Sequence, residues 1–184
     1  LNTFAKPTNV DTNSRILCYD IRDLGKQLLP VGMLVVLDSV FNRIIRNRRL
    51  GRSTWVYIDE IYLLFQHEYS ANFLFTLWKR VRKYGACCTG LTQNVDDLLQ
   101  SHTARTMLAN SEFLVMLNQA STDRAELARL LNISDNQLSY ITNVDFGRGL
   151  IKCGSAIVPF MDHFPKNNLY RLMSTKPSEA DAAV

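Results

Sequence analysis

The 184-residue chain lacks the residue patterns of zinc sites and disulfide frameworks. Its three histidines are scattered and form neither an H-E-x-x-H nor a C2H2 pattern, which argues against a zinc site. The four cysteines, Cys18, Cys87, Cys88 and Cys153, show no metal-ligand spacing either, and we expect them to be reduced thiols of a cytosolic protein. Cys87 and Cys88 are neighbours in an expected strand, so their side chains should point to opposite faces.

Long apolar runs, repeats and low-complexity linkers are also missing. The most apolar expected helix, Val31 to Ile45, carries Asp38, Asn42 and Arg43, and we predict that it is too short to span a bilayer. The composition, 47% hydrophobic and 21% charged, is that of an ordinary globular domain. The length suits one domain with a sizeable core.

A phosphate-binding loop is the third absence. The sequence contains no G-x-x-x-x-G-K-[ST], the loop whose backbone N–H groups and lysine hold nucleotide phosphates. Its eight glycines form no cluster, and Gly25-Lys26 lacks both the first glycine of that motif and the Ser or Thr after the lysine. We therefore expect that this chain alone is not an ATPase.

The net charge of +4 is unevenly distributed. Residues 42–52 include five arginines and no acidic residue. Such a run is typical of a solvated helix end, and the alternative is contact with an anionic partner such as DNA or a lipid surface.

Strand-like and helix-like periods alternate along the chain. We expect strands over 16–21, 55–61, 86–93 and 112–118, and a terminal hairpin over 149–154 and 155–161. Helices are expected over 34–45, 74–81 and 98–110, from about residue 121, and from Ser134, whose spacing to Gln137 is that of a capping box. Because several strands are apolar on both faces, we predict an α/β fold with a parallel sheet covered by helices. Residues 176–184 are expected to form a flexible tail.

Two adjacent carboxylates, Asp59 and Glu60, end the strand that begins at Trp55. In open α/β sheets, ligands gather beyond the carboxyl ends of the strands. Apolar residues followed by Asp-Glu make a Walker B pattern, in which the first carboxylate organises the magnesium shell and the second polarises the attacking water. A buried strand that ends in acidic residues also occurs by chance, so this pattern is weak when it stands alone.

Two further polar residues follow the acidic pair. Gln93 ends the next expected strand, where an amide can sense a γ-phosphate or hold the water. Arg82 follows the intervening helix, and from there an arginine can reach the nucleotide of a neighbouring subunit. The alternative for Arg82 is stabilisation of the helix end, whose dipole favours cations.

Four segments, taken in this order, resemble the carboxyl-terminal motor domain of conjugative-transfer ATPases. They are WVYIDEIYLLF, WKRVRKYGACCTGLTQNVDDLL, LANSEFLVMLNQASTDRAELARLLNIS and FPKNNLYRLMSTKP. These are the type IV secretion ATPases named for the fourth protein of the VirB operon, in the HerA/FtsK branch of RecA-like P-loop motors. The likeness covers nearly the whole chain, including RILCYDIRDLGKQLLPVGMLVVLDSVFNRIIRNR near its start. The combined order and spacing are specific, although no single motif is.

The resemblance implies a partial RecA-like sheet and ATP-driven work during DNA transfer or assembly of the transfer apparatus. It implies ATP and magnesium as cofactors of the full-length protein, with neither bound tightly to this chain. It also implies a homo-hexamer in the cytoplasm, at the cytoplasmic face of the inner membrane. The partners would be other secretion or conjugation subunits, with DNA as a further candidate.

Carried over by position, Asp59 is the Walker B aspartate that binds magnesium through its water shell, and Glu60 is the catalytic glutamate. Gln93 is the sensor glutamine. Arg82 matches an arginine proposed to act in trans in related motors. Arg124, in STDRAEL, is a weaker nucleotide-binding candidate, for which the alternative is solvation of a helix start.

The family has its phosphate loop upstream of the point where this sequence begins. We therefore expect residues 1–175 to be the carboxyl-terminal part of a motor domain without its Walker A segment. Without that central strand, 86–93 and 112–118 should either pair directly or leave an open slot. Because exposed strand edges recruit other chains, we expect a rearranged sheet or self-association. Two other readings stay open: a related DNA-pumping motor whose arginine run contacts phosphates, and a non-catalytic interaction module.

Overall fold

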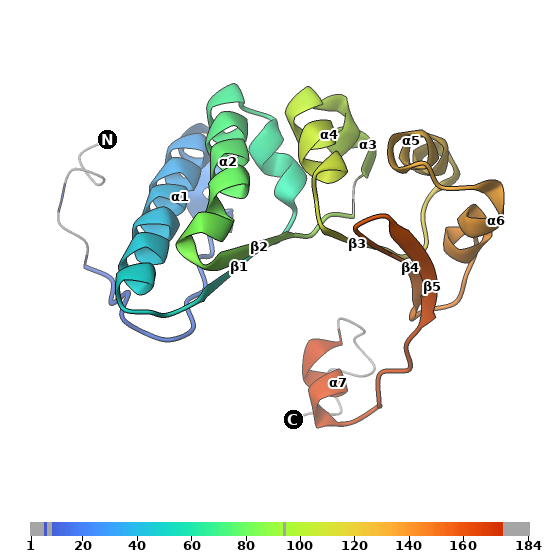
Figure 1. Cartoon of the computed structure of the whole chain (residues 1–184). Coiled ribbons are helices and arrows are strands. Elements are labelled where there is room, and N and C mark those ends of the chain that lie inside the picture. Colours follow the sequence, from blue (N-terminus) through green and yellow to red (C-terminus); the bar gives the residue numbers. More distant parts are fainter. Residues whose placement is uncertain (1–5, 7–8, 94, 175–184) are drawn as a thin grey trace. The chain divides into compact units, whose positions relative to one another are not determined.

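The computed structural model describes residue 6 and residues 9–93 and 95–174 (Figure 1). The predicted flexible tail, residues 176–184, lies outside this range. The chain divides into two compact units. Unit 1 comprises Leu1–Ile58 and Gln66–Thr89, and unit 2 comprises Asp59–Phe65 and Gly90–Val184.

Unit 1 contains two long helices and a two-stranded sheet. Its elements are η2 (Arg22–Leu24), α1 (Gly25–Arg49), β1 (Thr54–Ile58), α2 (Glu68–Arg80), η4 (Val81–Tyr84) and β2 (Ala86–Gly90, of which Gly90 belongs to unit 2). In Figure 1, α1 and α2 lie side by side over the β1–β2 pair. The predicted amphipathic helix is confirmed, because Leu74 and Leu77 of α2 are buried and the helical segment closes at Gly85 in the left-handed conformation.

Helix α1 is longer than the sequence pattern suggested. It has 25 residues, and Gln27–Arg49 is long and apolar enough to cross a membrane by length and composition, so the prediction of a helix too short for this was wrong. The helix continues past its apolar stripe because arginine is a good helix former and is favoured near a carboxyl terminus. A mostly buried core helix passes the same test, but only 22% of the apolar window of α1 is buried, although Met33, Leu37 and Ile44 pack inside unit 1.

The strand predicted over 16–21 is wrong. Residues 17–21 have no regular secondary structure, and the Ile16 side chain is 86% exposed. The segment instead lies along α1, where Arg43 Nη2 donates to the Ser14 carbonyl oxygen at 2.8 Å and the hydroxyls of Tyr19 and Ser39 lie 3.1 Å apart. An alternating pattern forms a strand only where a neighbouring strand accepts its backbone hydrogen bonds.

Unit 2 combines short helices with a three-stranded sheet. In chain order its elements are η3 (Ile61–Phe65), α3 (Val95–Gln100), α4 (His102–Ala109), β3 (Phe113–Met116), α5 (Ser121–Leu131), α6 (Asp135–Leu138), η5 (Ser139–Ile141), β4 (Arg148–Cys153), β5 (Ala156–Met161) and α7 (Asn168–Met173). The helix predicted over 98–110 is two helices, because Ser101 begins α4 by accepting a hydrogen bond from the Ala104 N–H at 3.3 Å. The capping box of Ser134 and Gln137 is confirmed.

The sheet of unit 2 is antiparallel, with strand order β3-β4-β5. Met116 lies opposite Leu150 between β3 and β4, and the predicted terminal hairpin is confirmed as β4 and β5. The prediction of a parallel sheet is wrong for β3, which pairs antiparallel with the first strand of this hairpin. β2 and β3 belong to different sheets, so the suggested direct pairing of 86–93 with 112–118 is also wrong.

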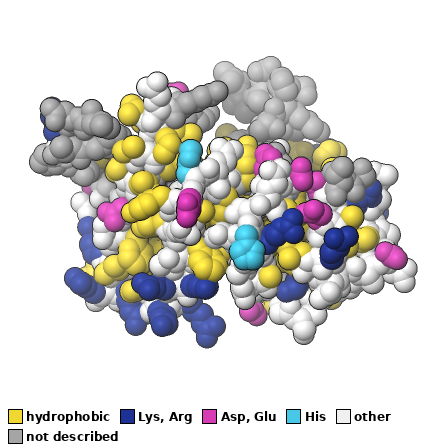
Figure 2. All heavy atoms as spheres, turned by 90° about the horizontal axis from the view of Figure 1, so that it is seen from above, with side chains coloured by type: hydrophobic (Ala, Val, Ile, Leu, Met, Phe, Trp, Pro, Cys, Tyr) yellow, Lys and Arg dark blue, Asp and Glu magenta, His cyan; other side chains and the backbone are white. Residues whose placement is uncertain are grey.

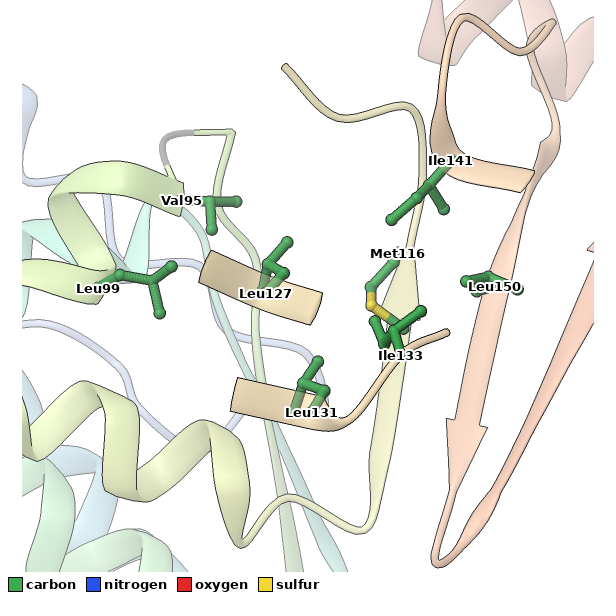
Figure 3. Packing of buried hydrophobic residues seen from close by; sticks show 8 residues of the cluster. All are labelled: Val95, Leu99, Met116, Leu127, Leu131, Ile133, Ile141 and Leu150. Carbon is green, nitrogen blue, oxygen red and sulfur yellow. The ribbon is translucent and has the colours of Figure 1, made fainter. Parts of the chain in front are cut away.

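The core of unit 2 lies between its helices and this sheet. Figure 3 shows eight buried side chains of this cluster. They come from α3, β3, α5, η5, β4 and the connection between α5 and α6: Val95, Leu99, Met116, Leu127, Leu131, Ile133, Ile141 and Leu150. Ile141 and Leu150 are completely buried. Burial of this kind stabilises a fold by about 25 cal/mol per Å² of apolar surface.

Candidate functional site

The acidic pair lies at the turn that follows β1. β1 ends at Ile58, and η3 begins at Ile61, so Asp59 and Glu60 form the connection between them. Glu60 has a φ of 46°, in the left-handed region that disfavours side chains with a Cβ. The other non-glycine residues of positive φ in the described chain, Asn132 and Asn143, are of the type that tolerates this conformation best. Strain of this kind is concentrated at functional sites.

Hydrogen bonds connect this turn to the segment after β2. The Glu60 N–H donates to Asp59 Oδ1 at 3.0 Å, and the Ile61 N–H donates to the Leu91 carbonyl oxygen at 2.9 Å. The Gln93 N–H points to Glu60 Oε2 at 3.5 Å, a long and therefore weak hydrogen bond. The structure thus brings together Asp59, Glu60 and Gln93, all within unit 2.

Gly90 makes this close approach possible, and it was not among the residues predicted to belong to the site. A Cβ at Gly90 would lie 2.5 Å from Cδ1 of Ile61, whose side chain is buried. A glycine inside a strand pattern often marks a place where another part of the chain approaches closely. That signal was available here, because Gly90 precedes Gln93 by only three residues in the expected strand.

The exposure of the three side chains suits contact with a polar ligand. Asp59 and Gln93 are exposed, and Glu60 is half-buried. Within the described part of the chain, no group of three or more His, Cys, Asp and Glu side chains is arranged to hold a metal ion. Magnesium usually keeps several of its waters and binds through one or two carboxylates, so the acidic pair fits a water-mediated contact.

Arg82 lies elsewhere in the fold. It is an exposed residue of η4 in unit 1, whereas Asp59, Glu60 and Gln93 belong to unit 2. Its carbonyl oxygen accepts a hydrogen bond from the Gly85 N–H at 3.1 Å, which is part of the helix-ending turn. The assignment of Arg82 therefore depends on the sequence spacing alone.

Arg124 lies in the first turn of α5 and is half-buried. Its N–H donates to the Ala120 carbonyl oxygen at 3.3 Å. Among the described residues, no hydrogen bond or ion pair joins its side chain to Asp59, Glu60 or Gln93. A nucleotide-binding role for Arg124 stays a prediction.

Comparison with known proteins identifies the family of this α/β chain. The model of the TraG P-loop domain matches residues 8–148, a span that includes all five candidate site residues. The chain belongs to the TraG P-loop domain family. No G-x-x-x-x-G-K-[ST] occurs in its sequence, although the family is named for the P-loop.

The fold of this TraG P-loop chain is similar to that of VirB4 of Thermoanaerobacter pseudethanolicus, with a TM-score of 0.79 at 26% sequence identity. The match covers 90% of this chain and 46% of the VirB4 chain, so the chain spans less than half of that structure. The predicted α/β fold of the RecA-like ATPase class is thereby confirmed, as is the relationship to the conjugative-transfer and type IV secretion ATPases. No curated protein sequence matches the chain.

Proposed function

We propose that the chain is part of an ATPase that powers conjugative DNA transfer or type IV secretion, and that it supplies the acidic strand end and the sensing amide of the nucleotide site. The observation that carries the proposal is the turn at Glu60. This residue has a strained backbone, directly follows Asp59, and accepts the Gln93 N–H at its carboxylate. The family match and the likeness to VirB4 support the same conclusion.

Each residue of the turn has one role in the proposed site. In the proposed reaction a water attacks the γ-phosphorus of ATP, the β–γ phosphoanhydride bond breaks, and ADP and phosphate leave. The Asp59 carboxylate would hold the magnesium ion through its water shell, and the ion would supply charge stabilisation for the phosphates. The Glu60 carboxylate orients the attacking water and withdraws its proton, while the Gln93 side-chain amide senses the γ-phosphate.

The proposed site also needs a loop that cradles the phosphates, and no G-x-x-x-x-G-K-[ST] occurs in these 184 residues. Arg82 would act in trans within a homo-hexamer, and Arg124 would contribute to nucleotide binding. The assembly would work at the cytoplasmic face of the inner membrane, with other subunits of the transfer apparatus as partners.

The test is Glu60→Gln in the longer protein that carries both this chain and a phosphate loop. The amide keeps the shape of the side chain but removes the charge that polarises water, so we expect MgATP binding to persist and turnover to fall by about 10²–10⁴-fold. Asp59→Ala should weaken magnesium-dependent nucleotide binding instead. Steady-state hydrolysis and equilibrium binding of a fluorescent ATP analogue measure the two effects.

Glu68→Gln is the matched control, because Glu68 is an exposed glutamate in the first turn of α2. It should hydrolyse ATP at the parental rate. Parental turnover in Glu60→Gln would contradict the Walker B assignment. A second candidate function, a non-catalytic interaction module on the same fold, is favoured by the missing phosphate loop, and it predicts no hydrolysis even in the longer protein.

A further inference from the structure

The carboxyl-terminal ends of two helical segments meet at one end of unit 1. The rings of Phe41 in α1 and Tyr84 in η4 pack edge to face with centroids 5.5 Å apart. The Arg48 guanidinium carbon lies 5.9 Å from the centroid of the same Tyr84 ring. The Thr54 N–H at the start of β1 donates to the Gly85 carbonyl oxygen at 3.4 Å. The last turn of α1 is therefore a direct neighbour of η4.

The loop after α1 is folded back onto the end of that helix. The Arg52 N–H donates to the Asn47 carbonyl oxygen at 2.9 Å, and the Gly51 N–H donates to the Arg48 carbonyl oxygen at 3.0 Å. The Asn47 side chain also donates to Thr54 Oγ1 at 2.9 Å. These bonds hold Arg52 at the end of the helix, next to the other cations.

Seven exposed cations gather there, and we call this surface the basic end: Arg46, Arg48, Arg49, Arg52, Arg80, Arg82 and Lys83. Figure 2 shows lysine and arginine side chains gathered along one edge of the part that contains α1 and α2. Residues 42–53 and 79–85 contain no aspartate or glutamate. Among the described residues, none of the seven forms an ion pair.

Stabilisation of the helix ends accounts for only part of this charge. A helix carboxyl terminus carries about half a negative elementary charge, so two such ends offset about one positive charge. The helix ends therefore leave most of the charge of the seven cations uncompensated, and their further side-chain polar contact within the described residues is the one from Arg46 Nη2 to Asn13 Oδ1 at 3.4 Å. A concentrated field of one sign attracts polyanions and speeds their association.

We propose that the basic end binds the phosphate backbone of double-stranded DNA. Six of its seven cations are arginines, whose planar guanidinium group forms paired hydrogen bonds with phosphate oxygens. An anionic lipid surface carries the same chemical group, but lipid binding is strengthened by apolar side chains that enter the bilayer. Leu50 is the one exposed apolar side chain interleaved with these cations in 46–52 and 80–83, since Val81 is buried. The phosphate backbone of DNA needs no such insertion.

The proposal requires no step of ATP hydrolysis, so it can be tested on the nucleotide-free 184-residue chain. Fluorescence anisotropy with a labelled duplex of mixed sequence gives Kd at several salt concentrations. If four to seven phosphates are contacted, log K should fall with log[salt] with a slope of about −4 to −6. A slope near zero, or no binding at 50 mM salt, would overturn the proposal.

Matched charge reversals locate the surface. Arg49→Glu/Arg52→Glu changes the basic end and leaves Arg82 intact, whereas Arg129→Glu/Arg171→Glu changes exposed arginines of α5 and α7 by the same net charge. The first pair should weaken DNA binding at least tenfold and flatten the salt slope by about 2, while the second should change Kd less than twofold. Equal losses in both pairs would contradict a defined site.

Two further measurements keep the test decisive. The milder pair Arg49→Gln/Arg52→Gln should lose about half as much binding energy as the reversal, and circular dichroism verifies that each variant is folded. Co-sedimentation with phosphatidylserine vesicles examines the lipid alternative. Vesicle binding that Arg49→Glu/Arg52→Glu abolishes, without any DNA binding by the parent chain, would overturn the proposal in favour of a membrane surface.

Discussion

At the scale of single residues, the two adjacent cysteines of β2 differ in environment. Cys87 is exposed and Cys88 is half-buried, which confirms that their side chains point to opposite faces of the strand. Burial, and secondarily the neighbouring Cys87, raises the pKa of the Cys88 thiol from 9.0 to about 12. The thiolate is the reactive form of cysteine, so Cys88 should be the less reactive thiol of the pair.

We expect iodoacetamide to modify Cys87 at least tenfold faster than Cys88 in the folded chain at pH 8–9, because each pKa unit lowers the thiolate fraction tenfold. Tandem mass spectrometry of the peptide that contains both residues measures the two rates, and the exposed Cys153 serves as a reference. The difference should vanish in denaturant. Equal rates in the folded chain would contradict the burial of Cys88.

The raised pKa of Cys88 also makes the stability of the fold depend on pH. A thiol whose pKa is raised on folding makes its full contribution to the free energy of unfolding below the unfolded pKa of about 9. This contribution is lost as the pH rises from about 9 toward 12. Cys88→Ala should therefore show a smaller loss of Tm between pH 8 and pH 10 than the parent. Each protein is compared with itself at two pH values, so the effect of the cavity left by the substitution on Tm, which does not depend on pH, cancels to first order.

At the scale of elements, Gly149 sets how closely β4 approaches β3. A Cβ at Gly149 would overlap the Met116 carbonyl oxygen, a backbone atom that is fixed by the sheet. A small side-chain movement therefore cannot remove the overlap at Gly149. At Gly90, by contrast, the nearest atom is the end of the Ile61 side chain. Glycine is therefore needed at 149 because the backbone of β3 lies too close for any side chain.

Gly149→Ala should lower the free energy of unfolding of unit 2 by about 1–3 kcal/mol or more, as overpacking does elsewhere. The matched control is Gly154→Ala in the same hairpin. There the φ of 57° disfavours alanine, but the nearest atom to an added Cβ is Glu112 Oε1 at 3.8 Å. We expect the control to cost about 1 kcal/mol. Urea unfolding followed by circular dichroism measures both, and a smaller loss for Gly149→Ala than for Gly154→Ala would contradict the predicted clash.

At the scale of the whole molecule, the missing phosphate loop has a direct consequence for ligand binding. The backbone N–H groups and the lysine of that loop provide most of the binding energy for a triphosphate. We therefore expect the 184-residue chain to bind MgATP weakly or not at all in calorimetry. Micromolar affinity would show that these residues contain a phosphate site of another kind.

The proposed trans role of Arg82 is tested by mixing subunits of the longer, ring-forming protein. Arg82→Ala and Glu60→Gln subunits should each be inactive in homogeneous rings, since an arginine finger typically contributes 10³–10⁵-fold to turnover. Mixed rings should regain part of the hydrolysis rate, because an intact Glu60 can meet an intact Arg82 from the neighbour. Arg80→Ala is the control, an exposed cation two residues away that should keep parental activity.

Two results would contradict this role for Arg82. One is full activity of Arg82→Ala alone, which would leave Arg82 as a cation that stabilises the end of its helix. The other is absence of recovered activity although native mass spectrometry shows that mixed rings form.

The sequence by itself determined the features that depend on local periodicity and local hydrogen bonds. The apolar spacing of Leu74 and Leu77 predicted α2, and Ser134 with Gln137 predicted a capping box. The terminal hairpin was predicted from two adjacent strand-like segments, 149–154 and 155–161, and the structure pairs them as β4 and β5. Asp59 and Glu60 were recognised for the same reason, since an acidic pair after an apolar run is visible within a few residues.

Only the tertiary structure decided the features that depend on residues far apart in the chain. The partner of β3 is β4, and residues 17–21 lie along α1 without forming a strand, because a strand exists only where another segment completes its hydrogen bonds. The turn at Glu60, with its positive φ, is joined to the distant segment after β2 by the hydrogen bond from the Ile61 N–H to the Leu91 carbonyl oxygen. The basic end likewise exists because aromatic packing brings the end of α1 beside η4, which no local pattern of charge could specify.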